Sequence, residues 1–318
     1  MSSPPVAVVY LAWGPLGDDV VRRFAGSYRA HSAGLDHTLV VVFNGFEPGS
    51  LALHAVRMAL DGCPHEALVL EEPLLDLAAY RVAARQFATG RCCFLNSYST
   101  ILAENWLARM GAALELPDVG LVGASASWAS YRSYARFALG FGGPYARVFV
   151  DRRGTMRALR AIAAREGALG ERRSGVAQYL DSATAVLEKF RGFGPFPARH
   201  VRTTGFMADA DIVVTLLDMP LRTKLDTYRA ESGVESLSAR VERSGRRLVV
   251  VGADGRAFAP HEWPDSSTFW QAGQENLLIA DNQTMSYLRS DGEQRAVLSR
   301  YAWGRAGLPL AMAARVPA

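Results

Sequence analysis

The stretch VAVVYLA at residues 6–12 is a continuous apolar run, which Trp13-Gly14-Pro15 closes and a helical pattern at Asp18–Ala30 follows. An apolar run without alternation is typical of a strand that is buried on both faces of a parallel sheet. The pattern repeats along the first 130 residues. Further strands are predicted at Thr38–Phe43, Ala67–Leu70, Cys92–Leu95 and Gly120–Gly123. This alternation predicts an α/β fold with a mostly parallel sheet flanked by helices.

The composition favours a well-packed globular protein. Of the 318 residues, 49% are hydrophobic and 21% are charged, so the low hydrophobicity of disordered chains is missing. The three cysteines are too few for a disulfide framework, and the first residues lack the positive charge that opens a signal peptide. No apolar stretch reaches the roughly 18 residues that a membrane helix needs. We therefore expect a cytoplasmic protein.

The middle of the chain differs from both ends. Residues 131–203 hold fourteen Lys or Arg against five Asp or Glu, whereas the whole chain has a net charge of +4. This excess indicates an anionic partner such as a phosphate or an acidic lipid surface, or a solvated arginine face. Nucleic acid is not expected, because the arginines lack regularly interleaved aromatic residues.

The secondary structure of this middle part and of the following residues is less regular. Ser125–Pro144 is predicted to be irregular, and Arg153–Arg165 and Val176–Phe190 to form basic helices. The apolar run resumes at Val213–Leu217 after a polar loop. A helix at Val234–Ser244 and a strand at Arg247–Val251 follow.

Polar and aromatic residues follow the predicted strands at their C-terminal ends, where ligands bind in open parallel sheets. Trp13 follows the first strand and could stack on a planar base. Asn44, Asp76 and Asn96 follow later strands and could bond the edge of the base or a ribose. Ordinary turn chemistry explains the Asn-Gly and Gly-Pro pairs equally well.

Several nucleotide-binding and catalytic signatures are missing. Gly14 and Gly17 give G-x-x-G, without the G-x-G-x-x-G spacing of a dinucleotide fingerprint. The sequence contains neither a P-loop motif nor the G-x-S-x-G elbow of α/β-hydrolases. A nucleotidyltransferase is also disfavoured, since its Gly-rich, Lys-containing N-terminal signature is missing.

A family resemblance rests on the order of several phrases. VVYLAWG, VVFNGF, LLDLAAY, CCFLNSYSTIL and VGLVGASAS resemble the nucleotide-binding half of GT-A glycosyltransferases, closest to bacterial family-two-like and rhamnan-synthesis-type enzymes. KFRGFGPFPARHVRTTGFM, KLDTYRAESGVESLSARVERSGRRLVVVG and FAPHEWPDSSTFWQAGQENLLIADNQT resemble a C-terminal region of sugar transferases. The resemblance covers residues 6 to about 288. It implies a GT-A-like, Rossmann-like sheet and glycosyl transfer from a nucleotide-sugar donor to a polysaccharide, lipid-linked or other glycoconjugate acceptor.

The resemblance also implies a division of the chain. Residues 1–130 would form the nucleotide-sugar-binding half, residues 131–200 a basic, largely helical insertion, and residues 201–318 the acceptor-binding and catalytic half with the tail. These three parts would belong to one continuous globular unit.

Donor-site residues follow from the resemblance position by position. Leu11, Ala12 and Trp13 lie where such enzymes grip the base, and Asn44 matches the Asn of a D-N-G-S-type turn whose Asp is replaced here by Phe43. Asp76 and Tyr80 match an acidic position followed by an Ala-Tyr pair. The remaining donor-site residues occupy the place of the metal-binding D-x-D motif and are Asn96, Ser97 and Tyr98.

This departure from D-x-D leaves three outcomes open, because hard divalent cations prefer carboxylate ligands. The enzyme could be metal-independent, with Arg199 and Arg202 neutralising the diphosphate. Alternatively, Asp281 and Asn282 could hold Mn²⁺ or Mg²⁺. The third outcome is a noncatalytic relative that binds only nucleotide or sugar.

An inverting transferase needs a carboxylate as general base. Glu231 precedes the predicted helix Val234–Ser244 and is the first candidate, whereas Glu235 could simply complement the helix dipole. His200 and Thr204 could bond a phosphate or an acceptor hydroxyl, and Trp263 could stack on a sugar or pack in a core or lid.

The apolar tail from Tyr301, with Arg305 and Arg315, has two interpretations. It could rest on a membrane surface, which would place the chain at the inner face of a membrane. A homodimer contact would explain the same pattern.

Overall fold

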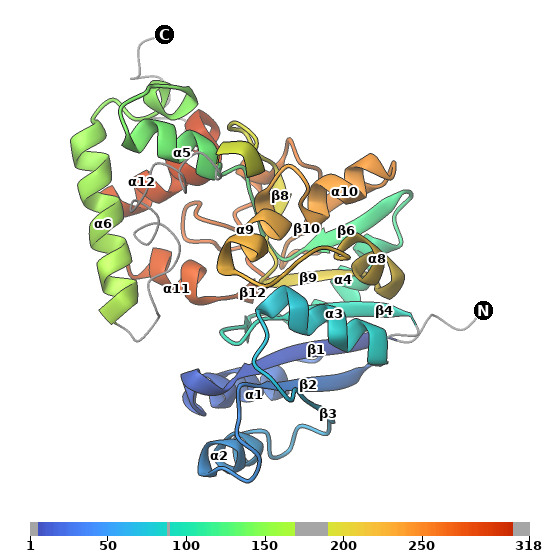
Figure 1. Ribbon diagram of the computed structural model, residues 1–318. Coiled ribbons are helices and arrows are strands. Elements are labelled where there is room, and N and C mark those ends of the chain that lie inside the picture. Colours follow the sequence, from blue (N-terminus) through green and yellow to red (C-terminus); the bar gives the residue numbers. More distant parts are fainter. Residues whose placement is uncertain (1–5, 88–89, 169–189, 308–318) are drawn as a thin grey trace.

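The computed structural model describes residues 6–87, 90–168 and 190–307 (Figure 1). Its centre is an eight-stranded sheet in the order β11-β10-β6-β9-β4-β1-β2-β3. Neighbouring strands are parallel except around β9, which is antiparallel to β4 and β6, and at the edge, where β11 is antiparallel to β10. The predicted α/β fold with a mostly parallel sheet is confirmed. The strands are β1 (Val6–Trp13), β2 (Thr38–Asn44), β3 (Glu66–Val69), β4 (Arg91–Leu95), β6 (Val119–Gly123), β9 (Gly205–Asp209), β10 (Arg247–Val251) and β11 (Ala257–Phe258).

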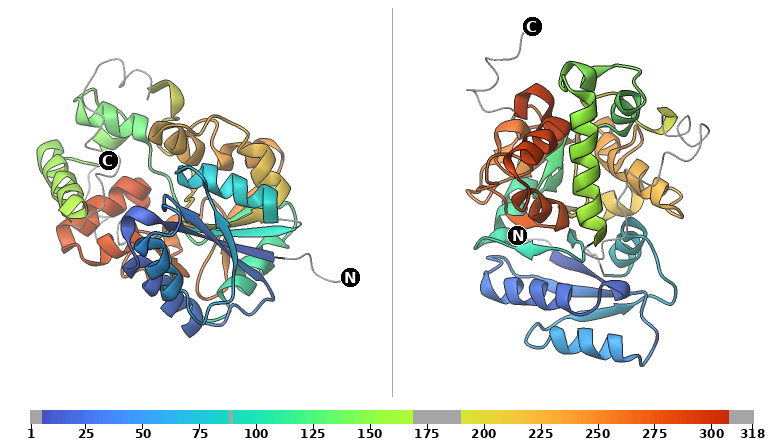
Figure 2. Two further views of the ribbon diagram at one scale, coloured as in Figure 1. Left: turned by 60° about the horizontal axis from the view of Figure 1, so that its bottom comes forward. Right: turned by 90° about the vertical axis from the view of Figure 1, so that its left-hand side faces the viewer.

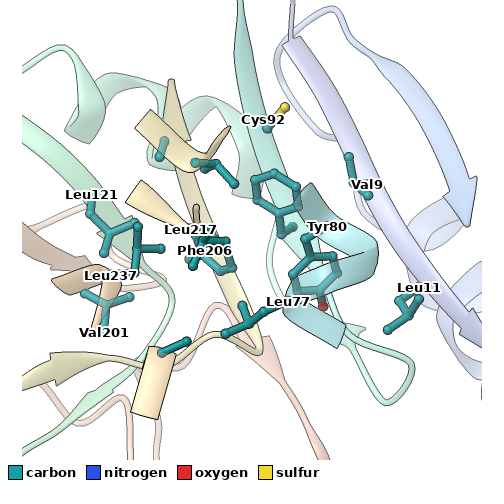
Figure 3. Close-up of a cluster of buried hydrophobic side chains, with 14 of the residues drawn as sticks. Val9, Leu11, Leu77, Tyr80, Cys92, Leu121, Val201, Phe206, Leu217 and Leu237 are labelled. Carbon is teal, nitrogen blue, oxygen red and sulfur yellow. The ribbon is translucent and has the colours of Figure 1, made fainter. Parts of the chain in front are cut away.

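Helices cover both faces of this sheet, because successive side chains of a strand point to opposite sides. Val9 and Leu11 of β1 belong to one core cluster and Val8 and Tyr10 to another. Helices α3 (Asp76–Phe87), α8 (Ala210–Leu216), α9 (Lys224–Ser232) and α10 (Leu237–Arg243) contribute to the first cluster, part of which Figure 3 shows. Helices α1 (Asp19–Ala30), α2 (Leu51–Ala59) and α4 (Trp106–Leu114) contribute to the second.

The basic middle segment packs with the C-terminal helices, at some distance from β1–β3 (Figure 1). A small core of its own contains Phe137, Tyr145, Phe149 and Val297. The elements of this part are α5 (Tyr131–Ala138), the short helix η2 (Pro144–Arg147), α6 (Arg152–Ala168), α11 (Asn282–Leu288) and α12 (Gly292–Trp303). Two short ribbons complete the fold, β5 (Thr100–Ile101) with β12 (Ile279–Ala280), and β7 (Ala126–Ser127) with β8 (His200–Val201).

One expectation about local structure was wrong, and two features were not foreseen. Ser125–Pro144 is not irregular throughout, because α5 starts where the Ser130 side chain caps the Ser133 amide. The apolar run at Val213–Leu217 lies in and directly after helix α8, where Val213 is buried in the first core cluster. Strand β9 was missed, since its pairing with β4 and β6 joins segments far apart in sequence.

Two further predictions have other outcomes. The predicted helix Val234–Ser244 is shorter, starting as α10 after the Ser236 cap. Most of Val176–Phe190, and the tail beyond residue 307, lie outside the described residues. Within the described ranges, no helix combines the length and the apolar character needed to span a bilayer. The division into three parts stays a prediction.

Candidate functional site

The C-terminal ends of β1, β2, β4 and β6 meet at one edge of the sheet, here called the C-terminal edge, and antiparallel β9 begins there. Leu95 pairs with Gly205, and the next amide along β4, that of Asn96, donates to the Thr204 carbonyl at 3.2 Å. Trp13 pairs with Asn44 at the ends of β1 and β2. The structure therefore brings the predicted donor-site positions to the edge where ligands bind in such sheets.

Asn44 at this edge has a structural role. Its side chain is buried, and its Nδ2 donates to the Leu74 carbonyl at 2.7 Å while its Oδ1 accepts from the Leu74 amide at 2.9 Å. This two-way clamp holds the loop that enters α3 and so places Asp76. We expected Asn44 to contact the ligand; it positions a neighbour instead.

Other predicted donor residues also tie strands together. Ser97 is buried, and its Oγ donates to the Leu11 carbonyl at 2.7 Å while Tyr10 Oη donates to the Ser97 carbonyl at 3.0 Å. The side chains of Leu11 and Ala12 are buried in the core. Because these contacts join the ends of β1 and β4, we assign Leu11, Ala12 and Ser97 to the frame of the site rather than to its surface.

Three donor candidates keep access to solvent: Trp13, Asn96 and Tyr98 are half-buried. A Cβ added at Gly45 would lie 3.0 Å from the Trp13 ring, so the indole packs directly on the turn after β2, where Gly45 has a φ of 76°. Asn96 Oδ1 accepts from the Tyr98 amide and from Ser99 Oγ, both at 3.1 Å. Trp13 and Tyr98 are therefore the partly exposed aromatic side chains among these donor candidates.

A pair of carboxylates, Asp76 and Glu231, lies on the α3 and α9 side of this edge. Asp76 begins α3 and is half-buried; Glu231 is half-buried in the last turn of α9. Burial raises the pKa of Asp76, nearby Lys224 opposes the rise, and the negative charge of Glu231 adds to it. The negative charge of Glu231 therefore acts on Asp76, as one carboxylate does on another nearby.

Glu231 is held by the start of β9. Its Oε1 accepts from the Thr203 amide at 2.9 Å and from Thr203 Oγ1 at 3.0 Å. Glu231 precedes α10, as expected, but it lies within the preceding helix α9, and the contact with Thr203 fixes its carboxylate. Among the described residues, both hydrogen bonds that Glu231 accepts are to Oε1. The other oxygen, Oε2, can therefore accept from a ligand.

Two buried hydroxyls beside the pair lack partners within the described ranges. Tyr80 lies one turn after Asp76 and is fully buried, yet its Oη forms no hydrogen bond there. Burial, then the charge of Asp76, raises the pKa of Tyr80. Thr227, one turn before Glu231, also has a buried Oγ1 without a partner. Unsatisfied buried hydroxyls cost free energy, and a ligand could satisfy them.

Figure 3 shows the ring of Tyr80 in the first core cluster with its oxygen on the side of Leu77 and Leu11. Leu11 is near the C-terminal end of β1, so the hydroxyl is directed toward the C-terminal edge. This orientation places an unused donor close to the predicted ligand side of the sheet.

His200 borders the same pair. Its Nδ1 donates to the Ala198 carbonyl at 2.7 Å, which leaves Nε2 as the unprotonated nitrogen of the neutral ring. Burial lowers the pKa of His200, although Glu231 opposes the shift. A neutral imidazole can accept a hydrogen bond from a hydroxyl.

Arg202 and Asp281 form a second cluster, which is closed. Arg202 Nη2 lies 2.6 Å from Asp281 Oδ2, and its guanidinium lies 4.1 Å from the centroid of the Phe269 ring. Although burial alone would raise it, Arg202, the Thr284 amide and the Thr204 hydroxyl hold the pKa of Asp281 below its ordinary value. The expected roles of Arg202 on a diphosphate and of Asp281 on a metal ion are therefore not supported, because each already neutralises the other.

The remaining candidates separate clearly. Trp263 is fully buried and donates to the Phe258 carbonyl at 3.0 Å, so its proposed stacking on a sugar is wrong. Arg199 is exposed and lies 5.7 Å from the centroid of the Trp128 ring. Glu235 forms an exposed ion pair with Arg243 at 2.8 Å, which favours Glu231 as the base.

The donor set does not fit a metal-binding motif. Within residues 6–87, 90–168 and 190–307, no three or more His, Cys, Asp or Glu side chains are grouped to hold a metal ion. Asn282, the other candidate metal ligand, is the first residue of α11 and follows Asp281, which caps that helix.

Sequence reasoning overlooked Lys224, Thr227 and Thr203. A signal for the first two was present, since Thr223 and Asp226 form a capping box that marks the start of α9. From that start, Lys224, Thr227 and Glu231 fall at helical spacing on one face. Thr203 gave no such signal, because its contact joins residues far apart in sequence.

No protein-family model matches this sequence, and no curated protein matches it either. Among solved structures, the mannosyltransferase PcManGT from Pyrobaculum calidifontis, in complex with GDP-Man and Mn²⁺, is 13% identical over 100% of this chain and 77% of that chain, with a TM-score of 0.45. S. aureus TarS 1–349 is 15% identical over 37% of this chain and 34% of that chain, with a TM-score of 0.29. The chain thus spans about a third of the TarS structure. At these scores the activity has to be argued from the site itself.

Proposed function

We propose that this protein is a glycosyltransferase that moves a sugar from a nucleotide-sugar donor to a hydroxyl of a polysaccharide, lipid-linked or other glycoconjugate acceptor. The observation that carries the proposal is the placement of two carboxylates, Asp76 and Glu231, at the C-terminal edge, beside a Tyr80 hydroxyl that has no partner among the described residues. PcManGT was solved with GDP-Man and TarS with UDP-GlcNAc, and we propose the same class of donor on the geometry of this edge.

Glu231 is the proposed general base. Thr203 holds one carboxylate oxygen, Oε1, so Oε2 can take the proton of the acceptor hydroxyl. The hydroxyl oxygen then forms a bond to the anomeric carbon while the bond from that carbon to the diphosphate breaks. The nucleoside diphosphate leaves with the electron pair, and the configuration at the anomeric carbon is inverted.

The donor would lie between Trp13 and α9. The Trp13 ring would stack on the base, and Asp76 would accept hydrogen bonds from the ribose or the sugar. Tyr80 Oη and Thr227 Oγ1 would gain the partners that they lack among the described residues. Lys224 is exposed and acts electrostatically on Asp76, so its ammonium can neutralise charge on the leaving diphosphate.

A divalent cation has no matching set of ligands at the expected place. Asn96 and Tyr98 stand where carboxylates of a D-x-D motif would be. Asp281 already forms a buried ion pair with Arg202. We therefore assign no step to Mn²⁺ or Mg²⁺. Metal dependence is tested by comparing nucleoside diphosphate binding in Mn²⁺ and in EDTA, where we expect equal affinity.

A noncatalytic nucleotide- or sugar-binding protein is the alternative. The observation that favours it is the replacement of D-x-D by Asn96-Ser97-Tyr98. Such a protein would use Trp13 and the buried hydroxyls for binding but would have no turnover to lose.

The test is a panel of nucleotide sugars and glycan acceptors, with release of nucleoside diphosphate as the readout. Glu231→Gln keeps an oxygen for the two Thr203 bonds and removes the basic oxygen. We expect turnover to fall by about 10²–10⁴-fold, with nucleotide affinity unchanged in calorimetry. Glu235→Gln is the matched control, because Glu235 lies in an exposed ion pair, and it should keep full turnover.

Three results separate the candidates. Unchanged turnover in Glu231→Gln would remove Glu231 as the base. Nucleotide binding without turnover for any donor would establish the noncatalytic alternative. Absence of both binding and turnover would reject a nucleotide-sugar site at this edge.

A further inference from the structure

The outer surface of α5, η2 and α6 carries an unbalanced positive charge. We call it the basic face and define it by seven exposed arginines: Arg132, Arg136, Arg147, Arg152, Arg153, Arg157 and Arg160. In the same range, 131–162, Asp151 is the single Asp or Glu, and its Oδ1 accepts from the Gly154 amide at 3.0 Å. Within the described residues, none of the seven arginines forms an ion pair.

Four of these arginines surround an open groove. Its volume is about 390 Å³, and its lining consists of Arg152, Arg153, Arg157, Arg160, Ala138 and Met156. Arg153, Arg157 and Arg160 follow helical spacing along one face of α6, whereas Thr155 and Ile162 are buried. The figures show α6 along the outside of the molecule, where the right-hand view of Figure 2 faces it. Among the described residues, the four arginines that line the groove are exposed.

Large apolar side chains are exposed at the same place. Val150 is 89% exposed, Phe141 65% and Leu139 42%. Arg152 Nη1 donates to the Ala138 carbonyl at 2.9 Å, which fastens the loop that carries Leu139 and Phe141 to the first turn of α6. Val150 lies two residues before Arg152. Exposed apolar residues therefore border the arginines directly.

We propose that the basic face docks on the surface of a lipid bilayer that contains anionic lipids. The arginines would pair with headgroup phosphates, while Phe141, Val150 and Leu139 would enter the boundary between headgroups and acyl chains. The combination favours a bilayer over a nucleic acid, because a nucleic acid would reward the arginines but not the exposed apolar side chains. This inference does not depend on glycosyl transfer.

Vesicle co-sedimentation tests the docking with the full chain. We expect binding to vesicles of phosphatidylcholine with phosphatidylglycerol, no binding to phosphatidylcholine alone, and weaker binding at high salt. Arg153→Glu with Arg157→Glu should weaken binding by about tenfold or more. Phe141→Ser with Val150→Ser should weaken it by about tenfold.

Matched controls change the opposite end of the molecule. Arg23→Glu with Arg57→Glu alters the net charge equally on exposed residues of α1 and α2, and Leu51→Ser removes an apolar side chain that is 88% exposed. Both controls should keep most of the binding. All substituted side chains are exposed, so we expect the variants to fold. Unchanged melting temperatures would confirm this.

Three results would overturn the proposal. Equal binding to neutral vesicles would remove the charge complementarity. An equal loss of vesicle binding in the Arg23→Glu, Arg57→Glu control would show that net charge, and not the basic face, determines binding. A serine variant with full binding, together with equally tight binding of duplex RNA, would identify the face as a nucleic-acid surface instead.

Discussion

Two aspartates near the C-terminal edge lie in opposite environments. Asp281 is buried, faces the Arg202 guanidinium at 2.6 Å and has a lowered pKa. Asp76 is half-buried beside another carboxylate, Glu231, and has a raised pKa. The contrast separates an acid whose charge is neutralised within the fold from an acid that we propose to belong to the functional site.

The partners of the two aspartates make the same distinction. Arg202 also donates to Ser125 Oγ at 3.1 Å and to Gln283 Oε1 at 2.9 Å, so the cluster around Asp281 satisfies its charges internally. Around Asp76, the hydroxyls of Tyr80 and Thr227 have no partner in the described part of the chain. Substitutions in the first cluster should therefore cost stability, and those in the second should cost binding or turnover.

Breaking the Arg202–Asp281 pair should have the largest effect on stability. Arg202→Met leaves a buried carboxylate without its partner, and we expect the free energy of unfolding to fall by about 3–5 kcal/mol. Urea denaturation measures this loss in the free energy of unfolding. Arg243→Met, which removes the exposed pair with Glu235, is the control and should leave the free energy of unfolding almost unchanged.

This comparison also depends on pH. A lowered pKa means that Asp281 stabilises the folded state above its unfolded pKa of about 4, and that this contribution is lost as the pH falls through the folded value. The gap between wild type and Arg202→Met should therefore narrow in acid. A gap that stays constant from neutral to acid pH would show that the ion pair is not its cause.

Removing the hydroxyls of two buried tyrosines should have the next-largest effects. Tyr80→Phe removes a hydroxyl that has no partner in the described part of the chain, so stability should stay unchanged or rise, while nucleotide-sugar affinity should fall by about tenfold. Tyr10→Phe removes the bond to the Ser97 carbonyl and should cost about 1 kcal/mol without an effect on affinity. Thermal unfolding and calorimetry measure both. A destabilised Tyr80→Phe with normal affinity would make Tyr80 purely structural.

Asp76→Asn should change stability less than Arg202→Met, and in the opposite direction. A raised pKa means that the contribution of Asp76 is fully present below its unfolded pKa and is lost as the pH rises through the folded value. The variant should therefore be more stable than wild type at neutral pH, with the advantage shrinking toward pH 4. Unfolding at several pH values checks the sign, and a less stable variant at neutral pH would contradict it.

The sequence predicted the parallel part of the sheet well, because each strand there is a local apolar run. The strand at Arg247–Val251 has the predicted bounds, and β1, β2, β4 and β6 differ by one residue at an end. Strand β9 could not be predicted in this way. Its place between β4 and β6 depends on pairing with distant segments, and its sequence follows a polar loop.

The same distinction holds for the site. The rule that ligands bind at strand ends selected Trp13, Asp76 and Asn96, but it could not distinguish a residue such as Asn44, which holds a loop, from a residue that contacts a ligand. The sequence suggested ligand roles for Trp263 and Arg202, but both side chains are buried and have partners within the fold. Tertiary packing sets this burial and these partners. Their side-chain chemistry alone could not reveal this.

The most direct test of the account is one NMR titration of the side-chain carboxyl carbons of Asp76 and Asp281 in the full chain, assigned with Asp76→Asn and Asp281→Asn. The account predicts that Asp76 titrates above the ordinary aspartate value of about 3.9 and Asp281 below it. In Glu231→Gln the pKa of Asp76 should fall, since the neighbouring charge is removed. An Asp76 that titrates at or below the ordinary value, unaffected by Glu231→Gln, would contradict the assignment of this pair as the chemical centre.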